Sequence, residues 1–218
     1  MNLCPLVLVL GSLLAGEAKQ IPVGPGVTLE MNGDMRRVIV QSRVVLRKGP
    51  LEGLLTREKK KEHEYILAAD VDARHIHTAL ELARARAGKP VTFSPKFQPA
   101  EGSAVKILLR FEQGGKKMAI PAGDWIREDR TNKALPSTWV FAGSRFGPNP
   151  DGPNKPPFYL ANHGDLICVV NMESALLDLP HRSPKAFNDR IYRADTDSIP
   201  EVGTRVEVIL EPQTMKPR

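Results

Sequence analysis

Cysteine is scarce in this chain of 218 residues, which has only Cys4 and Cys168. Cys4 lies ahead of an N-terminal apolar segment, and Cys168 lies inside the apolar run DLICVV. Two single thiols, far apart in the sequence, are too few for a disulfide framework or for the set of thiolates that binds zinc or an iron–sulfur cluster. We predict that Cys168 is a buried structural thiol that shares one face of a strand with Leu166 and Val170.

Complete catalytic motifs are also lacking. The sequence has no phosphate loop, dinucleotide fingerprint or calcium loop. The segment AGSRFG around Ser144 does not match GxSxG, and HEY at residues 63–65 lacks the second histidine of a zinc-binding HExxH helix. These absences favour a non-enzymatic binding or interaction module, and no cofactor is predicted.

Charge is missing from the N-terminal residues 3–16, which are apolar throughout. This run is too short to span a bilayer, which takes about 20 residues. Gly16 and Ala18 occupy the −3 and −1 positions for a cut before Lys19, which is the layout of a secretory signal peptide. We therefore expect residues 1–18 to be a signal peptide and the mature chain to be extracytoplasmic, that is, periplasmic or secreted.

The whole chain carries a net charge of +6, and removal of residues 1–18 takes away Glu17 but no Lys or Arg, which raises it to +7. Such a surface suits anionic components of the cell envelope, and another envelope protein is the alternative partner. Nucleic acid is not favoured, because the basic residues are spread along the chain and REKKKE is their one run. The mature chain has no predicted transmembrane span.

The rest of the chain predicts one domain over residues 36–218, preceded by a Gly/Pro-rich lead-in at 19–35. The β-branched run at 36–46, the stretch HEYILAADV and the final TRVEVILEP each predict a strand. Gly114–Gly115 predicts the turn of a hairpin, and five prolines within 147–157 predict a loop. The fold class is therefore α+β, with a mainly antiparallel, curved or barrel-like sheet.

One principal helix is predicted at about residues 73–87. Asp72 is a suitable N-cap, and Val71 with Ile76 fits a hydrophobic staple. Apolar residues then recur at helical spacing, and Gly88 followed by Pro90 predicts the end.

The candidate site consists of His63, Glu64, His75 and His77, which surround the junction of the HEYIL strand and this helix. His63 and His77 are the candidates for a transition-metal site, and the same group could instead act as an acid–base site. Residues two apart on a helix diverge by about 200°, so His75 and His77 do not readily share an ion. The alternative is that these histidines only fix the junction, where the helix N-terminus also offers N–H groups to an anion.

Taken together, GPLEGLL, KEHEYILAADVDARHIHTALELA, GDWI, WVFAGS, GDLICVVN and ALLDLP resemble the YdjY-domain family from about Val38 to Pro212. This bacterial group consists mostly of exported or membrane-associated proteins without an established activity, so the resemblance implies one exported domain and no catalytic residues. The family pattern KEHES ends here in Tyr65. Because some relatives occur with iron–sulfur modules, a redox-accessory role remains a further alternative to the binding module and the enzyme.

Overall fold

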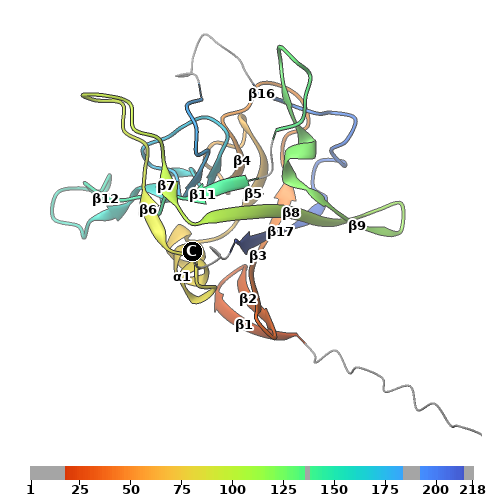
Figure 1. Ribbon diagram of the computed structural model, residues 1–218, viewed down its shortest axis with the longest axis horizontal. Coiled ribbons are helices and arrows are strands. Elements are labelled where there is room, and N and C mark those ends of the chain that lie inside the picture. The colour runs from red at the N-terminus through yellow and green to blue at the C-terminus, as the bar shows by residue number, and fades with distance from the viewer. Residues whose placement is uncertain (1–17, 136–137, 184–191, 214–218) are drawn as a thin grey trace, which may run out of the picture.

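The computed structural model describes residues 18–135, 138–183 and 192–213, and these ranges are mostly strand with one α-helix (Figure 1). The helices are α1 (Ala73–Leu82) and the short 3-10 helices η1 (Ala122–Trp125) and η2 (Leu160–His163). Within these ranges, no helix has the length and apolar character that a membrane crossing needs. The strands are β1 (Lys19–Gly24), β2 (Val27–Asn32), β3 (Met35–Val44), β4 (Gly53–Arg57), β5 (Tyr65–Ala69), β6 (Ala87–Lys89), β7 (Glu101–Gly102), β8 (Ala104–Gln113), β9 (Lys116–Pro121), β10 (Ile126–Glu128), β11 (Thr138–Phe141), β12 (Phe146–Gly147), β13 (Phe158–Tyr159), β14 (Ile167–Cys168), β15 (Leu177–Asp178), β16 (Tyr192–Ala194) and β17 (Arg205–Pro212).

Eight strands form a closed, barrel-like ring. Their order is β3–β17–β8–β11–β15–β14–β4–β5, and β5 then pairs with β3. The pairs β4–β5 and β14–β15 are parallel, and the other neighbours in the ring are antiparallel. The predicted α+β class with a barrel-like, mainly antiparallel sheet and a single principal helix is confirmed.

Each of the two long strands, β3 and β8, pairs along one of its edges with two different strands in succession. On the edge away from β17, β3 pairs first with β2 and then, at Arg43 and Val44, with β5. In the same way β8 pairs with β11 near its start and with β9 over its second half. The hairpin β1–β2 and the strand β9 therefore stand outside the ring.

Residues 19–35, expected to be a lead-in, instead form the hairpin β1–β2. Alternating apolar residues on β1 and β2 explain the difference, because Ile21, Val23, Leu29 and Met31 pack on the core. Gly26, at a φ of 69°, makes the tight turn between the two strands. The glycine and proline content of this segment marks a turn and a bulge within a hairpin.

Helix α1 begins where predicted but ends at Leu82 instead of near residue 87. The end is a Schellman motif, in which Arg84 N–H donates to Glu81 O and Ala85 N–H donates to Leu80 O. Arg84 supplies the left-handed residue of that motif, with a φ of 69°, in the place that glycine usually takes. Gly88 therefore lies beyond the helix, in β6.

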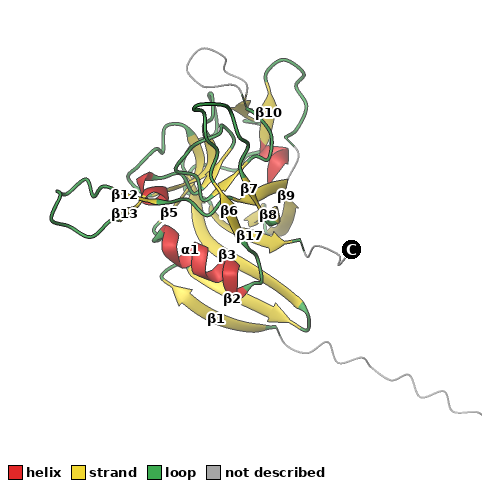
Figure 2. Cartoon of the chain, turned by 60° about the vertical axis from the view of Figure 1, so that its left-hand side comes forward, coloured by secondary structure: helices red, strands yellow, loops and turns green. Residues whose placement is uncertain are grey.

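The core fills the ring and the space between the helix and the sheet. Inward residues alternate along β3, as Val38 and Val40 do, and the matching residues of β17 and β8 are equally buried. The helix lies across β1, β2 and β3 with Ile76 and Leu80 buried against them (Figure 2). Full burial of each such side chain stabilises the fold by about 1.5–3 kcal/mol.

The hairpin β8–β9 is confirmed, with Gly114 and Gly115 at φ values of 58° and 74°. Both glycines have the positive φ that the narrow turn requires. The strand expected from HEYILAADV is shorter than predicted, since it begins at Tyr65. His63 and Glu64 therefore belong to the preceding turn and do not alternate across a strand.

Candidate functional site

His63 lies on the surface, with 75% of its side chain exposed. Its Nε2 is 3.7 Å from Glu64 Oε2, a surface contact that contributes little to stability. Neither residue contacts His75 or His77 in any hydrogen bond or ion pair of the described ranges. The structure therefore separates this pair from the helix that was expected to complete the site.

His75 packs on the first strand of the hairpin. Its ring covers Gly24 so closely that a Cβ there would overlap it. Its Nδ1 is buried without a hydrogen-bond partner among the described residues. The ring therefore acts as a packing surface between α1 and β1.

His77 lies on the opposite flank of the helix. Its Nδ1 is 2.8 Å from the hydroxyl of Tyr159, and that hydroxyl donates to Gly143 O. A hydroxyl has one proton, which Tyr159 gives to Gly143, so Nδ1 of His77 carries a proton and donates to the Tyr159 hydroxyl. Nε2 is left facing Glu81 Oε1 at 3.5 Å, and the ring edge meets Phe141 at a centroid distance of 4.9 Å.

The three histidines therefore occupy three separate places. Across residues 18–135, 138–183 and 192–213, no group of three or more His, Cys, Asp or Glu side chains could hold a metal ion. Sequence proximity suggested a cluster, but the turn before β5 carries His63 away, and the helical twist sends His75 and His77 to opposite flanks.

The N-terminus of α1 is occupied by the protein itself. Ala73 N–H donates to Asn162 Oδ1, and Arg74 N–H donates to Asp72 Oδ1. Burial would raise the pKa of Asp72, but the hydrogen bonds from Arg74 and Asn162 outweigh it and hold that pKa well below its usual range. His75 N–H donates to Asp72 O. The free N–H groups that were expected to attract an anion are therefore already satisfied.

A buried polar cluster, which we call the Asp165 cluster, joins KEHEY to GDLIC. It consists of Asp165 with Lys61, Tyr65, Cys168 and Ser174. Asp165 Oδ1 accepts from Tyr65 at 2.9 Å and pairs with Lys61 Nζ at 2.9 Å, while Ser174 donates to Oδ2 at 2.5 Å. Tyr65, where the sequence departs from the family pattern, thus supplies a hydrogen bond from the turn–strand boundary.

Within the Asp165 cluster, the Sγ of Cys168 lies 3.6 Å from the Tyr65 hydroxyl. Burial, together with the charge of Asp165, raises the pKa of the Cys168 thiol far above its ordinary value. Burial likewise raises the pKa of Tyr65. Both side chains are fully buried and protonated, so this cluster anchors the turn and does not present a nucleophile.

Alternation does not explain the burial of Cys168. Leu166, Ile167 and Val169 are buried as well, and Val170, expected to share the face of Cys168, is half-buried. The reason is that β14 is a central strand of the sheet, paired with β4 on one edge and β15 on the other, and its residues are buried on both faces.

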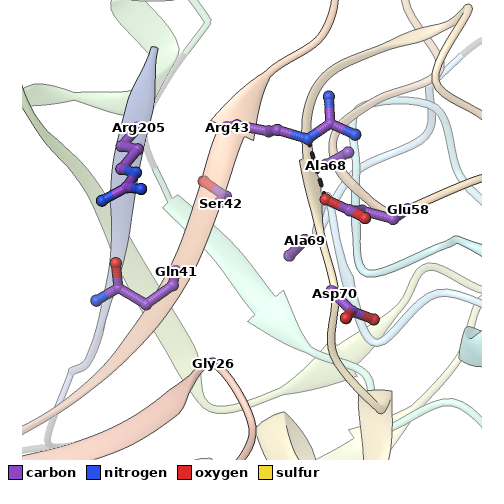
Figure 3. A pocket seen from close by; sticks show the side chains of 9 residues that line it. All are labelled: Gly26, Gln41, Ser42, Arg43, Glu58, Ala68, Ala69, Asp70 and Arg205. Atoms are coloured by element: carbon purple, nitrogen blue, oxygen red, sulfur yellow. Dashed lines mark hydrogen bonds and ion pairs between the residues drawn. The ribbon is translucent and has the colours of Figure 1, made fainter. Parts of the chain in front are cut away.

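A hollow of about 380 Å³ lies on the outer face of the sheet, where the edge of β3 passes from β2 to β5 (Figure 3). Charged residues stand around an uncharged floor. The lining residues are Gly26, Gln41, Ser42, Arg43, Glu58, Ala68, Ala69, Asp70 and Arg205.

Two arginines on neighbouring strands line this hollow, and the Arg43 side chain extends towards Glu58, away from Arg205 (Figure 3). Arg205 of β17 is the register partner of Arg43 of β3. Arg43 is paired with Glu58 at 3.0 Å and with Glu62 at 3.6 Å. The Arg205 side chain, in contrast, makes no hydrogen bond or ion pair with any residue of the described ranges.

A second hollow of about 500 Å³ adjoins the first and shares Gln41 and Arg205 with it. Arg110 and Lys117 line it on the side of β8 and β9, and Arg110 is paired with Glu207. Arg205 therefore stands between the two hollows. Sequence reasoning missed this surface because its residues come from strands whose pairing the sequence does not state.

Comparison with known proteins identifies a family. The family model described as YdjY domain matches residues 29–211, which include the ring from β3 to one residue before the end of β17. No curated protein and no solved structure matches the chain.

Proposed function

The chain belongs to the YdjY-domain family, and from that premise we propose that it is an extracytoplasmic, non-enzymatic binding module that holds an anionic group on the outer face of its barrel. The anionic group binds at Arg205, between the two hollows. The matching model names a domain and no activity, so the geometry of the surface has to supply the argument.

The extracytoplasmic part of this proposal rests on the N-terminal sequence. The charge-free residues 3–16 and the Gly16-x-Ala18 pattern have the form of a signal peptide. A cut before Lys19 would fall at the first residue of β1, so the mature chain would keep every strand of the described fold.

The single observation that carries the binding proposal is the Arg43–Arg205 pair. Val44 N–H donates to Thr204 O, while Gln41 N–H donates to Gly26 on the opposite edge of β3. Arg43 and Arg205 therefore form a non-hydrogen-bonded pair, the type whose Cα atoms are about 4.5 Å apart and whose side chains lie closest. Like charges directly opposite each other destabilise a sheet.

An anion bound beside the Arg205 guanidinium offsets the charge of Arg205 and whatever repulsion by Arg43 remains. Glu58 and Glu62 already offset Arg43, whereas Arg205 is exposed and unpaired within the described ranges. Arg205 is thus the group with unused hydrogen-bonding capacity, and guanidinium matches the two oxygens of a carboxylate or phosphate.

The test compares Arg205→Gln with Arg86→Gln in titrations with inorganic phosphate and with hexanoate. Arg86 is a matched control because it is also exposed and its side chain has no partner among the described residues. Backbone amide NMR shifts of residues 41–43 and 205–207 should move on titration, and Arg205→Gln should weaken binding about 10-fold or more, as expected for a charge-assisted hydrogen bond. Equal affinities of the two variants, with shifts elsewhere, would overturn the proposal.

The geometry of His77 supports one alternative, an acid–base or metal function. The Tyr159 hydroxyl fixes the ring through Nδ1, as outer-shell partners do for ligating histidines, and Nε2 faces Glu81. Zinc titration of the wild type and of His77→Ala tests this alternative. Stoichiometric zinc binding that His77→Ala abolishes would favour it over the binding module.

A further inference from the structure

We propose that the ligand is a zwitterion, with a carboxylate that binds Arg205 and an ammonium group that binds Asp70. This inference rests on the proposed function and names the chemical class of its ligand. It follows from which charges in the hollow are paired and which are not.

Asp70 and Arg205 stand on opposite sides of the hollow (Figure 3). Arg205 belongs to β17, and Asp70 directly follows β5. Asp70 is exposed, and its carboxylate makes no hydrogen bond or ion pair with any residue in the described ranges. The hollow therefore has one uncompensated cation and one uncompensated anion, at separate ends.

The charges between these ends cancel. Arg43 Nε donates to Glu58 Oε1 at 3.0 Å, and the dashed line in Figure 3 marks this contact. With that pair neutralised, the lining as a whole has no net charge. A simple anion would satisfy Arg205 and be repelled by Asp70, whereas a dipolar ligand satisfies both.

The floor of the hollow leaves room and offers few competing polar groups. Ser42 Oγ donates to Val206 O, and Gln41 Nε2 donates to Glu207, so both are engaged. Ala68 has a short side chain that does not fill the space, and the Ala69 methyl packs in the core. Recognition must therefore come from the two charged ends.

The span between the ends sets the length of the ligand. Arg43 of β3 is the register partner of both Arg205 and Ala68, so two strand spacings, about 10 Å, separate Arg205 from Ala68. Asp70 lies two residues beyond Ala68, which lengthens the backbone span to about 12 Å. The volume of about 380 Å³ corresponds to roughly a dozen water molecules at about 30 Å³ each. A short amino-carboxylate chain, the size of 6-aminohexanoate, fits both measures.

The test titrates the protein with 6-aminohexanoate, hexanoate and adipate, and follows binding by amide NMR shifts and calorimetry. We expect 6-aminohexanoate to bind at least 10-fold more tightly than hexanoate, with adipate the weakest. Asp70→Asn should abolish the preference for 6-aminohexanoate and, because it removes the repulsion by Asp70, should strengthen hexanoate binding slightly, while Asp197→Asn, an exposed control, should change neither. Arg205→Gln should weaken both ligands.

The outcomes separate the two proposals. Equal affinity for 6-aminohexanoate and hexanoate, or an unchanged preference in Asp70→Asn, would overturn the zwitterion and leave the anionic site at Arg205 in place. Failure of every carboxylate and of phosphate to bind at Arg205 would overturn the proposed function itself. Both variants replace exposed side chains, so melting temperatures at or above that of the wild type are expected and confirm that each comparison is made on folded protein.

Discussion

The ring of His75 occupies the space that any side chain at position 24 would need, because a Cβ on Gly24 would overlap its Nδ1, Cγ and Cε1 atoms. The contact joins α1 to β1, the outermost strand of the hairpin. His75 therefore has a structural role, as the alternative to a metal or acid–base site allowed, but it packs on β1 and does not fix the strand–helix junction.

We predict that Gly24→Ala destabilises the protein by about 1–3 kcal/mol, as overpacking usually does. The companion change His75→Ala should remove the clash, so Gly24→Ala should cost much less in that background. Urea unfolding of the two single variants and the double variant measures the coupling. Additive effects would show that the ring moves aside freely and that the contact does not fix the hairpin.

His77→Ala should lower the free energy of unfolding by about 1–3 kcal/mol, because the Tyr159 hydroxyl loses a buried partner and Phe141 loses an edge contact. His63→Ala, at an exposed turn, should change it by less than about 0.5 kcal/mol. Thermal and urea unfolding provide both values. If His77→Ala left the free energy of unfolding unchanged but lost zinc binding, the result would instead support a functional role for this histidine.

Cys168→Ser should destabilise the fold by about 1–3 kcal/mol, since the shorter C–O bond draws the buried hydroxyl away from the Tyr65 hydroxyl, which lies 3.6 Å from the thiol sulfur, and leaves it poorly paired. Binding at Arg205 should be unchanged in the folded variant. In the chain that begins at Lys19, Cys168 is the single thiol, so a thiol reagent should label it slowly in buffer and rapidly in denaturant. Rapid labelling of the native protein would show that the site opens.

Asp178 should make stability depend on pH in an unusual direction. Burial is the main cause that raises the pKa of this carboxyl to about 7, against 3.8 for an ordinary Asp. The folded state then keeps a proton that the unfolded state has released, so stability falls as pH rises from about 4 to about 7, by up to about 4 kcal/mol.

The matched variant for this prediction is Asp178→Asn, which cannot titrate. Its amide loses one of the acceptor sites that Asn171, Leu179 N–H and Met172 N–H use, so it should be less stable than the wild type at pH 4. The difference between the two proteins should then shrink as the pH rises to 8. Denaturant unfolding across this range gives the difference, and a constant value would contradict the raised pKa.

Local signals predicted most of the strands and the start of the helix. The alternating β-branched residues of β3 and β17 and the N-cap at Asp72 depend on neighbours in the chain, which the sequence displays directly. The end of α1 was predicted wrongly, because Arg84 adopts the left-handed conformation in place of the glycine that the sequence offered at position 88.

The candidate surfaces depend on pairings between distant residues. Tyr65 lies 100 residues from Asp165, and Arg205 meets Arg43 through the register of the last strand against the third. No periodicity in the sequence indicates such a register. Sequence reasoning therefore selected His63 and His77, which are near each other in the chain, and could not find the distant pairs. Physical neighbours in this barrel are largely non-local.

The position of β17 also bears on when the barrel can form during synthesis. Ser42 and Val206, 164 residues apart, are cross-strand neighbours, and β17 lies between β3 and β8 in the ring. Until residues 205–212 are made, the ring lacks β17, and β3 and β8 have no strand between them to pair with. Non-local pairing of this kind folds slowly, so the growing polypeptide stays open until its last strand is made, which is the state that the proposed export would require.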